Sequence, residues 1–144
     1  MEEQAVRQKA EQFIKALHAW ETAPAEDATP LETLVSFYAN DAHLTNSALK
    51  LVSDERVGTE QIRSFWSDYK KTLGKAYSKF HQVTVNGEAA GLFWTTDGTD
   101  NSGAQGGAHY DGTTLLVFNS EGKIRFFQGY YDTRQLNREM GMEK

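Results

Sequence analysis

The last third of the chain contains the feature that most constrains its fold, a pair of strand-like segments joined by a short turn. Residues 113–118 read TTLLVF and residues 124–127 read IRFF, and both runs are rich in the β-branched and aromatic residues that favour strands. Between them lies NSEG at residues 119–122, whose glycine can adopt the positive φ angle that a short loop requires. The pattern predicts a long antiparallel hairpin, against which the rest of the chain must pack.

Composition limits the class of protein. With 144 residues, 39% hydrophobic and 24% charged, the chain is long enough to bury a core, and we expect a single domain over residues 1–144. No apolar run approaches ~20 residues and no basic-then-apolar leader is visible, so we expect no membrane span and a cytoplasmic protein. The net charge of −5 argues against a nucleic-acid surface, and the absence of cysteine excludes disulfides and cysteine metal sites.

Helical periodicity precedes the strands. Apolar residues recur at steps of three and four over residues 4–20, and again over residues 59–73. A Thr-Pro-Leu-Glu sequence at residues 29–32 combines a capping signal with proline at the first helical position, which predicts a short middle helix. Strand patterns follow at residues 77–85 and 89–96, around an Asn-Gly pair typical of a two-residue hairpin turn. Three helices followed by antiparallel strands predict an α+β fold with the helices on one face of the sheet.

Four motifs in this order resemble the landmarks of the nuclear transport factor 2-like superfamily, and more closely its SnoaL-like polyketide cyclase and ketosteroid isomerase branch. They are FYANDA at residues 37–42, VGTEQIRSFW at 57–66, EGKI at 121–124 and YYD at 130–132. The resemblance implies a cystatin-like roll, in which a cone-shaped, strongly curved antiparallel sheet wraps around three N-terminal helices and encloses an apolar pocket. It also implies a homodimer, which we expect to form through the outer face of the sheet, where Phe126, Gln128 and Tyr130 alternate outward.

The resemblance also indicates where the catalytic groups of that branch would lie, and this chain lacks the known sets. Phe13 stands at the position of the oxyanion tyrosine, Asn46 at that of the general base, and Thr114 at that of the protonated aspartate. Gly129 stands where the related epoxide hydrolases have a catalytic aspartate. An amide cannot take a proton at accessible pH, so the isomerase and hydrolase machinery is not expected here.

Strand alternation, combined with the resemblance, predicts which side chains face the pocket. Aromatic residues of the last helix are expected to close it from the other side, which gives the usual make-up of a site for an apolar small molecule. The alternative is that these aromatic side chains fill the core of a small domain. The predicted ligand-binding residues are Asn46, Phe65, Trp66, Tyr69, Phe93, Thr95, Thr114, Leu116, Phe118, Phe127 and Tyr131.

Ionisable residues near this pocket are the candidates for proton transfer. Asp97 falls on the inward side of its strand by alternation, and Asp111 is the next candidate. His81 or His109 beside one of these carboxylates would form an orienting pair of the kind found in dehydratases. We therefore assign Asp97 and His109 as the predicted catalytic residues, with the alternative that the two aspartates belong to the flanking loop and face water. No His-x-His or His-Glu-x-x-His spacing occurs, and no metal site is predicted.

Two classes of function remain open. The first is a small-molecule-binding protein with an aromatic pocket that acts, without a cofactor, as a cyclase, isomerase or dehydratase on an apolar ketone or polyketide. The second is a non-catalytic ligand-binding or dimerisation module, because a fold does not determine a function. The expected partners are an apolar small molecule and a second copy of the chain, with neither nucleic acid nor membrane.

Overall fold

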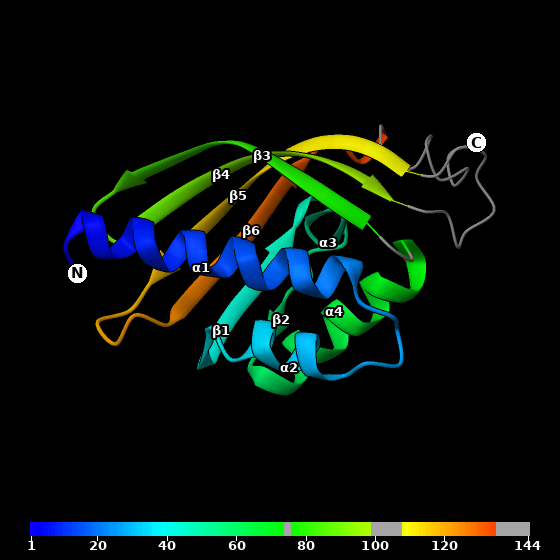
Figure 1. Cartoon of the computed structure of the whole chain (residues 1–144), viewed down its shortest axis with the longest axis horizontal. Coiled ribbons are helices and arrows are strands. Elements are labelled where there is room, and N and C mark those ends of the chain that lie inside the picture. The colour runs from blue at the N-terminus through cyan, green and yellow to red at the C-terminus, as the bar shows by residue number, and fades with distance from the viewer. Residues whose placement is uncertain (74–75, 99–107, 135–144) are drawn as a thin grey trace.

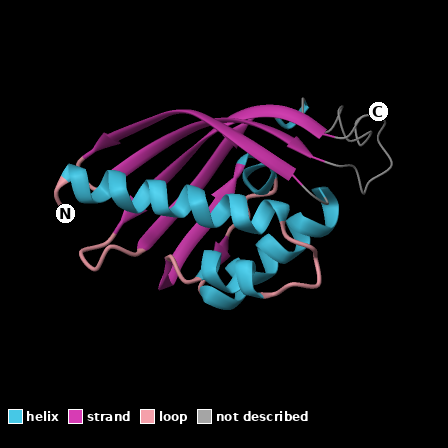
Figure 2. Cartoon of the chain, viewed as in Figure 1, coloured by secondary structure: helices cyan, strands magenta, loops and turns pink. Residues whose placement is uncertain are grey.

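The computed structural model describes residues 1–73, 76–98 and 108–134, and within them four helices and six strands (Figure 1). In chain order these are α1 (Glu3–Thr22), α2 (Thr29–Val35), β1 (Tyr38–Asn46), α3 (Ser47–Leu51), β2 (Arg56–Val57), α4 (Thr59–Leu73), β3 (Ala76–Asn86), β4 (Ala89–Gly98), β5 (Ala108–Phe118) and β6 (Ile124–Tyr131). The main helices cover one face of a curved sheet (Figure 2). The fold is α+β, as expected.

The sheet is six-stranded, with the order β2-β1-β6-β5-β4-β3. Neighbours pair antiparallel except β1 and β6, which run parallel with Asn46 opposite Gly129. The sheet is therefore mixed rather than wholly antiparallel. The difference arises because β1 does not pair with β3, the first strand of the meander that follows it. It pairs instead with β6, the last strand, and a long crossover connection allows these two strands to run parallel.

Helix α1 lies against β3 and spans the concave face of the sheet (Figure 1). Its buried stripe includes Val6, Phe13, Leu17 and Trp20, as the periodicity predicts, and each buried Phe or Leu contributes roughly 1.5–3 kcal/mol. The helix continues to Thr22, beyond the predicted end at residue 20. This extra half-turn adds Glu21 to the buried face.

Helices α2 and α4 pack together beneath the sheet (Figure 1). Pro30 opens α2, and Gly58 precedes α4 with a φ angle of 85°, which glycine adopts without strain. Arg63 of α4 binds both carboxylate oxygens of Glu32 on α2, at 2.8 and 2.9 Å. Hydrogen bonding to Arg63 lowers the pKa of Glu32. None of the helices in the described residues is long and apolar enough to cross a bilayer.

The predicted C-terminal hairpin is present, with β5 and β6 paired antiparallel. Gly122 in its loop has a φ angle of 77°, and the Asn119 side chain accepts hydrogen bonds from the loop backbone. The β3–β4 turn differs slightly from the prediction. Asn86 pairs with Ala89, so the turn consists of residues 87–88, one position later than expected, with Gly87 at a φ angle of 61°.

Strand β4 presents the opposite face from the one predicted. The predicted inward orientation of its odd-numbered residues is wrong, since Phe93 is 39% exposed and the Asp97 side chain is 69% exposed. Alternation could not decide the orientation, because residues 92–94 are all apolar. The register with β5 decides it: Leu92 lies opposite Thr114, and cross-strand partners share one face of a sheet. The residues of β4 that face the helices are Leu92, Trp94 and Thr96.

Candidate functional site

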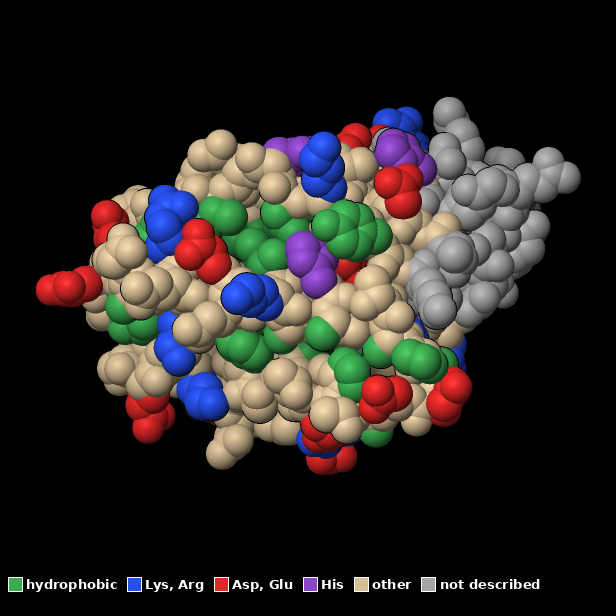
Figure 3. Space-filling view, viewed as in Figure 1, with side chains coloured by type: hydrophobic (Ala, Val, Ile, Leu, Met, Phe, Trp, Pro, Cys, Tyr) green, Lys and Arg blue, Asp and Glu red, His purple; other side chains and the backbone are tan. Residues whose placement is uncertain are grey.

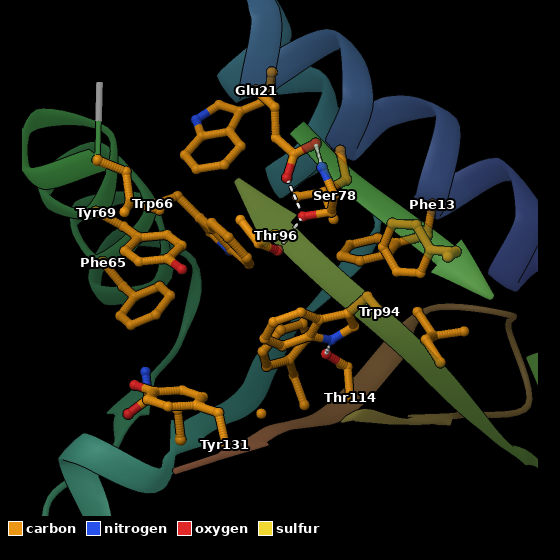
Figure 4. Close-up of a pocket in the computed structure, with 18 residues that line it drawn as sticks. Phe13, Glu21, Phe65, Trp66, Tyr69, Ser78, Trp94, Thr96, Thr114 and Tyr131 are labelled. Atoms are coloured by element: carbon orange, nitrogen blue, oxygen red, sulfur yellow. Dashed lines mark hydrogen bonds between the residues drawn. The ribbon is translucent and has the colours of Figure 1, made fainter. Parts of the chain in front are cut away.

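A cavity lies between the helices and the concave face of the sheet (Figure 4). Its volume is about 60 Å³, not counting the open mouth. The enclosed part therefore favours a compact ligand. The lining residues come from α1, α4 and five strands: Phe13, Leu17, Trp20, Glu21, Asn46, Phe65, Trp66, Tyr69, Leu73, Ser78, Phe80, Leu92, Trp94, Thr96, Thr114, Phe127, Gly129 and Tyr131.

Aromatic rings form most of the cavity wall. Trp66 meets Trp20 edge to face with ring centroids 5.0 Å apart, and it meets Phe127 at 5.6 Å in the same geometry. Phe65 and Tyr69 stack at 6.0 Å on the same helix. Figure 4 shows these α4 rings on one side of the space and Trp94 on the other. Edge-to-face pairs hold one another in place, so the wall is built from mutually supported rings.

Trp94 owes its position to a glycine. Gly112 lies opposite it on β5, and a side chain there would meet the indole carbons at 2.5 Å. The indole Nε1 donates a hydrogen bond of 2.9 Å to Thr114 Oγ1. The Thr114 oxygen therefore has a protein donor, and its hydroxyl proton can still be donated to another group.

The carboxyl group of Glu21 lies at one end of the cavity (Figure 4). Its Oε1 accepts a 2.9 Å hydrogen bond from the Ser78 backbone N–H, and its Oε2 is 2.5 Å from Ser78 Oγ. Ser78 Oγ lies a further 2.6 Å from Thr96 Oγ1. Glu21 is 3% exposed, and burial raises its pKa, against the opposing effects of the Ser78 hydrogen bonds and of the positive charges of His18 and Lys70.

Lys70 stabilises the helix end that carries Glu21. Its buried Nζ donates to the carbonyl oxygens of Trp20 at 2.6 Å and Glu21 at 2.9 Å, and it lies 5.3 Å from the centre of the Trp20 ring. Free carbonyl groups and the negative end of the helix dipole both favour a cation at a helix C-terminus. Lys70 therefore acts as a C-terminal cap of α1. Close by, His18 Nε2 lies 2.7 Å from the Ser78 carbonyl oxygen.

Asn46 lines the cavity, but its amide oxygen is used within the fold. Asn46 Oδ1 accepts a 2.8 Å hydrogen bond from the Leu49 N–H and caps α3. The Ser47 hydroxyl next to it accepts one from the Tyr131 N–H at 2.9 Å. Asn46 and Thr114 thus each have a protein partner, so neither side chain needs a ligand to avoid being left without a hydrogen bond.

Tyr110 is a buried polar residue behind the wall. Its ring packs edge to face on Trp94 at 5.4 Å and on Tyr131 at 5.6 Å. Among the described residues its hydroxyl has no hydrogen-bond partner, and burial, followed by the nearby Tyr131 and Glu21, raises its pKa. It is not part of the cavity lining, so it supports two rings of the wall rather than contacting a ligand.

The structure brings together most, but not all, of the predicted pocket residues. Leu116 and Phe118 are fully buried in the core rather than at the cavity. Phe93 and Thr95 lie on the outer face, for the reason given above for β4. The seven that do line the cavity are Asn46, Phe65, Trp66, Tyr69, Thr114, Phe127 and Tyr131, and their role in binding remains a prediction.

The predicted catalytic residues form pairs on the outer face of the sheet. His109 Nδ1 is 2.5 Å from Asp97 Oδ1, with both side chains more than half exposed. His81 Nε2 contacts Thr95 Oγ1 at 2.8 Å, and Thr95 in turn donates to Asp111. Histidine and aspartate are thus neighbours, as expected. They face away from the cavity, so none of them can act on a molecule bound inside it.

Sequence reasoning missed the carboxyl group that does reach the cavity. We expected the first helix to end at residue 20, one position before Glu21, because the apolar periodicity stops there. A usable signal was present: Glu21 follows Leu17 by four positions, so it continues the same face if the helix does not stop. Trp94 and Thr96 were missed for a different reason, since apolar residues and threonines occupy both faces of β4 over residues 92–96.

The fold and the enclosed aromatic cavity define an α+β roll of the nuclear transport factor 2-like, ketosteroid isomerase-like class. Within that class the chain belongs to the SnoaL-like domain family, whose model matches residues 11–127. The comparison with curated proteins gave no match.

Two solved structures show the same fold at low sequence identity. A hypothetical protein with a ketosteroid isomerase-like fold from Catenulispora acidiphila DSM 44928, in complex with trimethylamine, is similar with a TM-score of 0.73. Its identity is 19%, over 91% of this chain and 93% of that chain. A de novo designed protein with a curved β-sheet has a TM-score of 0.67 and 15% identity, over 99% of this chain and 97% of that one.

Proposed function

We propose that this protein binds a compact, largely apolar small molecule in the cavity between α1, α4 and the sheet. The observation that carries the proposal is the wall itself, in which aromatic rings from both helices and from the sheet surround one enclosed space. Such linings, with few polar groups, are typical of small-molecule sites. The Catenulispora protein, described in complex with trimethylamine, supports the idea that this fold can hold a small organic molecule.

A second candidate function is proton transfer on a bound apolar ketone, as in a cofactor-independent isomerase, cyclase or dehydratase. The observation that favours it is the buried Glu21 at the cavity. A carboxyl group whose pKa is raised by burial is a better general base near neutral pH than an exposed one. In this hypothesis Glu21 takes a proton from carbon next to the carbonyl group and returns it to the ligand, so no co-reactant is needed.

Binding can be tested with a matched pair of aromatic substitutions. Phe65→Ala removes a ring from the cavity wall, whereas Phe93→Ala removes the same ring from the outer face. Small aromatic hydrocarbons, ketones and amines are screened by tryptophan fluorescence, because three indoles line the cavity. We expect at least one compound to bind, with affinity about tenfold weaker in Phe65→Ala, equivalent to about 1.4 kcal/mol, and unchanged in Phe93→Ala. Equal effects of the two substitutions, or no binding by any compound, would refute the proposal.

Catalysis is tested separately with the ketones that bind. Exchange of the protons next to the carbonyl group for deuterium is followed by NMR in the native protein, in Glu21→Gln and in Glu11→Gln. Glu11 is exposed on the same helix, so its substitution makes the same charge change away from the cavity. Exchange that is lost only in Glu21→Gln supports proton transfer, and exchange at the uncatalysed rate in the native protein leaves binding as the function.

A further inference from the structure

The cavity has an unusual balance of charge and hydrogen-bonding groups. Among the described residues that line it, Glu21 is the only carboxylic acid, and Lys, Arg and His are absent from the lining. Lys70 and His18 lie close to Glu21 and contact backbone carbonyl oxygens of lining residues, but neither side chain is itself part of the lining. The cavity therefore contains an acid without a basic residue inside the same space.

The neutral part of the wall adds to this negative character. Aromatic rings present a partial negative charge on their faces and attract cations. Two indole N–H groups, which could otherwise bind an anion, already have partners in the protein. Trp66 donates to the Tyr38 hydroxyl at 3.2 Å, and Trp94 donates to Thr114. The carboxylate and the ring faces would repel an anionic ligand, whereas both would attract a cation.

The protein already holds one ammonium group in this way. Lys70 Nζ lies 5.3 Å from the centre of the Trp20 ring, and the same indole forms part of the cavity wall. The distance is within the ~6 Å at which an ammonium group is attracted to a ring. Lys70 also donates two hydrogen bonds to carbonyl oxygens, which a lysine requires and a methylated ammonium does not.

From these observations we propose that the cavity selects a small tertiary or quaternary ammonium compound, with its methyl groups against the aromatic rings and its charge facing Glu21. The inference rests on the proposed binding function and specifies its ligand class. Methylation fits because Ser78 already takes one acceptor position on each Glu21 oxygen, and a methylated ammonium needs fewer of the remaining positions than a primary one. The site then supplies charge and apolar contact rather than further hydrogen-bond acceptors.

An isosteric pair of soluble probes separates charge from shape. Choline and 3,3-dimethylbutan-1-ol have the same outline, but only choline carries a positive charge. We expect the native protein to bind choline at least tenfold more tightly than the alcohol in titrations followed by tryptophan fluorescence. Equal affinities, or tighter binding of the alcohol, would overturn the ligand class and leave the binding function standing. If neither probe nor any compound of the wider screen binds, the binding function itself fails.

The role of Glu21 is tested with the same probes. Glu21→Gln keeps the shape and should weaken choline binding at least tenfold, with less than a twofold change for the alcohol. The exposed Glu11→Gln controls for net charge and should leave both affinities unchanged. A folded Glu21→Gln protein that binds choline as tightly as the native protein would overturn the proposal.

The dependence on pH gives a second test that needs no change at Glu21. Choline keeps its charge at every pH, so a preference over the alcohol that weakens as the pH falls from 8 to 4 reports protonation in the protein. The charged and titratable groups that face Glu21 are His18 on its own helix, Lys70 on α4 and Tyr110 on β5. A histidine also gains positive charge in this range, so the series is repeated in His18→Gln. The preference for choline must still weaken at low pH in His18→Gln. A preference that does not change with pH in this variant contradicts the role of Glu21.

Discussion

Replacing Gly112 by alanine should destabilise the protein by displacing Trp94 from the cavity wall. A Cβ atom at this position would lie 2.5 Å from two indole carbons and 2.6 Å from the Tyr130 backbone oxygen. The indole cannot simply rotate away, because its Nε1 is bound to Thr114 and its ring packs on Tyr110. The backbone oxygen is held in the β5–β6 ladder and cannot move without the strand.

The magnitude follows from two opposing contributions. Overpacking of a well-filled site costs about 1–3 kcal/mol, and here the contact involves backbone as well as a ring. Alanine has less conformational freedom than glycine in the unfolded chain, which stabilises the folded state by about 0.4–1 kcal/mol. We therefore expect a net loss of about 1–2 kcal/mol in the free energy of unfolding. For a chain of this length that corresponds to a fall in Tm of about 3–8 °C.

Gly129→Ala is the matched control, on the neighbouring strand and also at the cavity. Its Cβ would meet the Asn46 Cβ at 3.5 Å, an ordinary contact. Urea unfolding and near-ultraviolet circular dichroism are measured on both variants, since the second reports the environment of the indoles. Only Gly112→Ala should lose stability and change the tryptophan signal. If the two variants are equally stable and spectrally alike, the close approach of Trp94 to Gly112 is not a constraint on this fold.

Three further predictions concern charge and assembly. Because burial raises the folded-state pKa of Glu21 above its ordinary 4.5, its stabilising contribution is present below that pH and is lost as pH rises. The stability of native protein relative to Glu21→Gln should therefore fall as the pH rises above 4.5 in urea titrations, and a constant difference would contradict this. Lys70→Met should lower the free energy of unfolding by about 1–3 kcal/mol, because two carbonyl groups at the end of α1 lose their partner. The control, Lys71→Met at an exposed position, should change it by less than about 0.5 kcal/mol. Equal losses of stability in thermal unfolding would refute the capping role of Lys70. The homodimer expected through the outer face of the sheet, where Phe93 and Tyr130 are exposed, should give about twice 16.2 kDa in light scattering, and the mass of one chain at all concentrations would exclude it.

Much of the fold could be predicted because its signals are local. The apolar stripe of α1, the glycine before α4 and the turn residues of the last hairpin each act within a few positions of sequence. The parallel pairing of β1 with β6 could not be predicted in this way. Its register depends on the crossover between two strands at opposite ends of the chain, and no short motif describes it.

The candidate site was harder to predict because it depends on which face each strand presents. On β5 the resemblance to the isomerase branch matched Thr114 to a pocket position, and Thr114 lines the cavity. On β4 the consecutive residues Leu92 and Phe93 are both apolar, so the wrong face was equally plausible. That single inversion moved Asp97 from the predicted cavity to the solvent and left Glu21, on a different element, as the buried acid.

The parallel pairing of β1 with β6 also affects the order in which parts of the chain can fold. Asn46 and Gly129 lie side by side in the cavity wall, yet one precedes almost the whole sheet in sequence and the other completes it. Contacts between such distant segments form slowly, because a long loop must close first. During synthesis on the ribosome, β1 has no partner at this edge until β6 has emerged. The cavity is therefore expected to be among the last parts of the molecule to form, and a chain that stops before β6 would have its helices but no complete cavity wall.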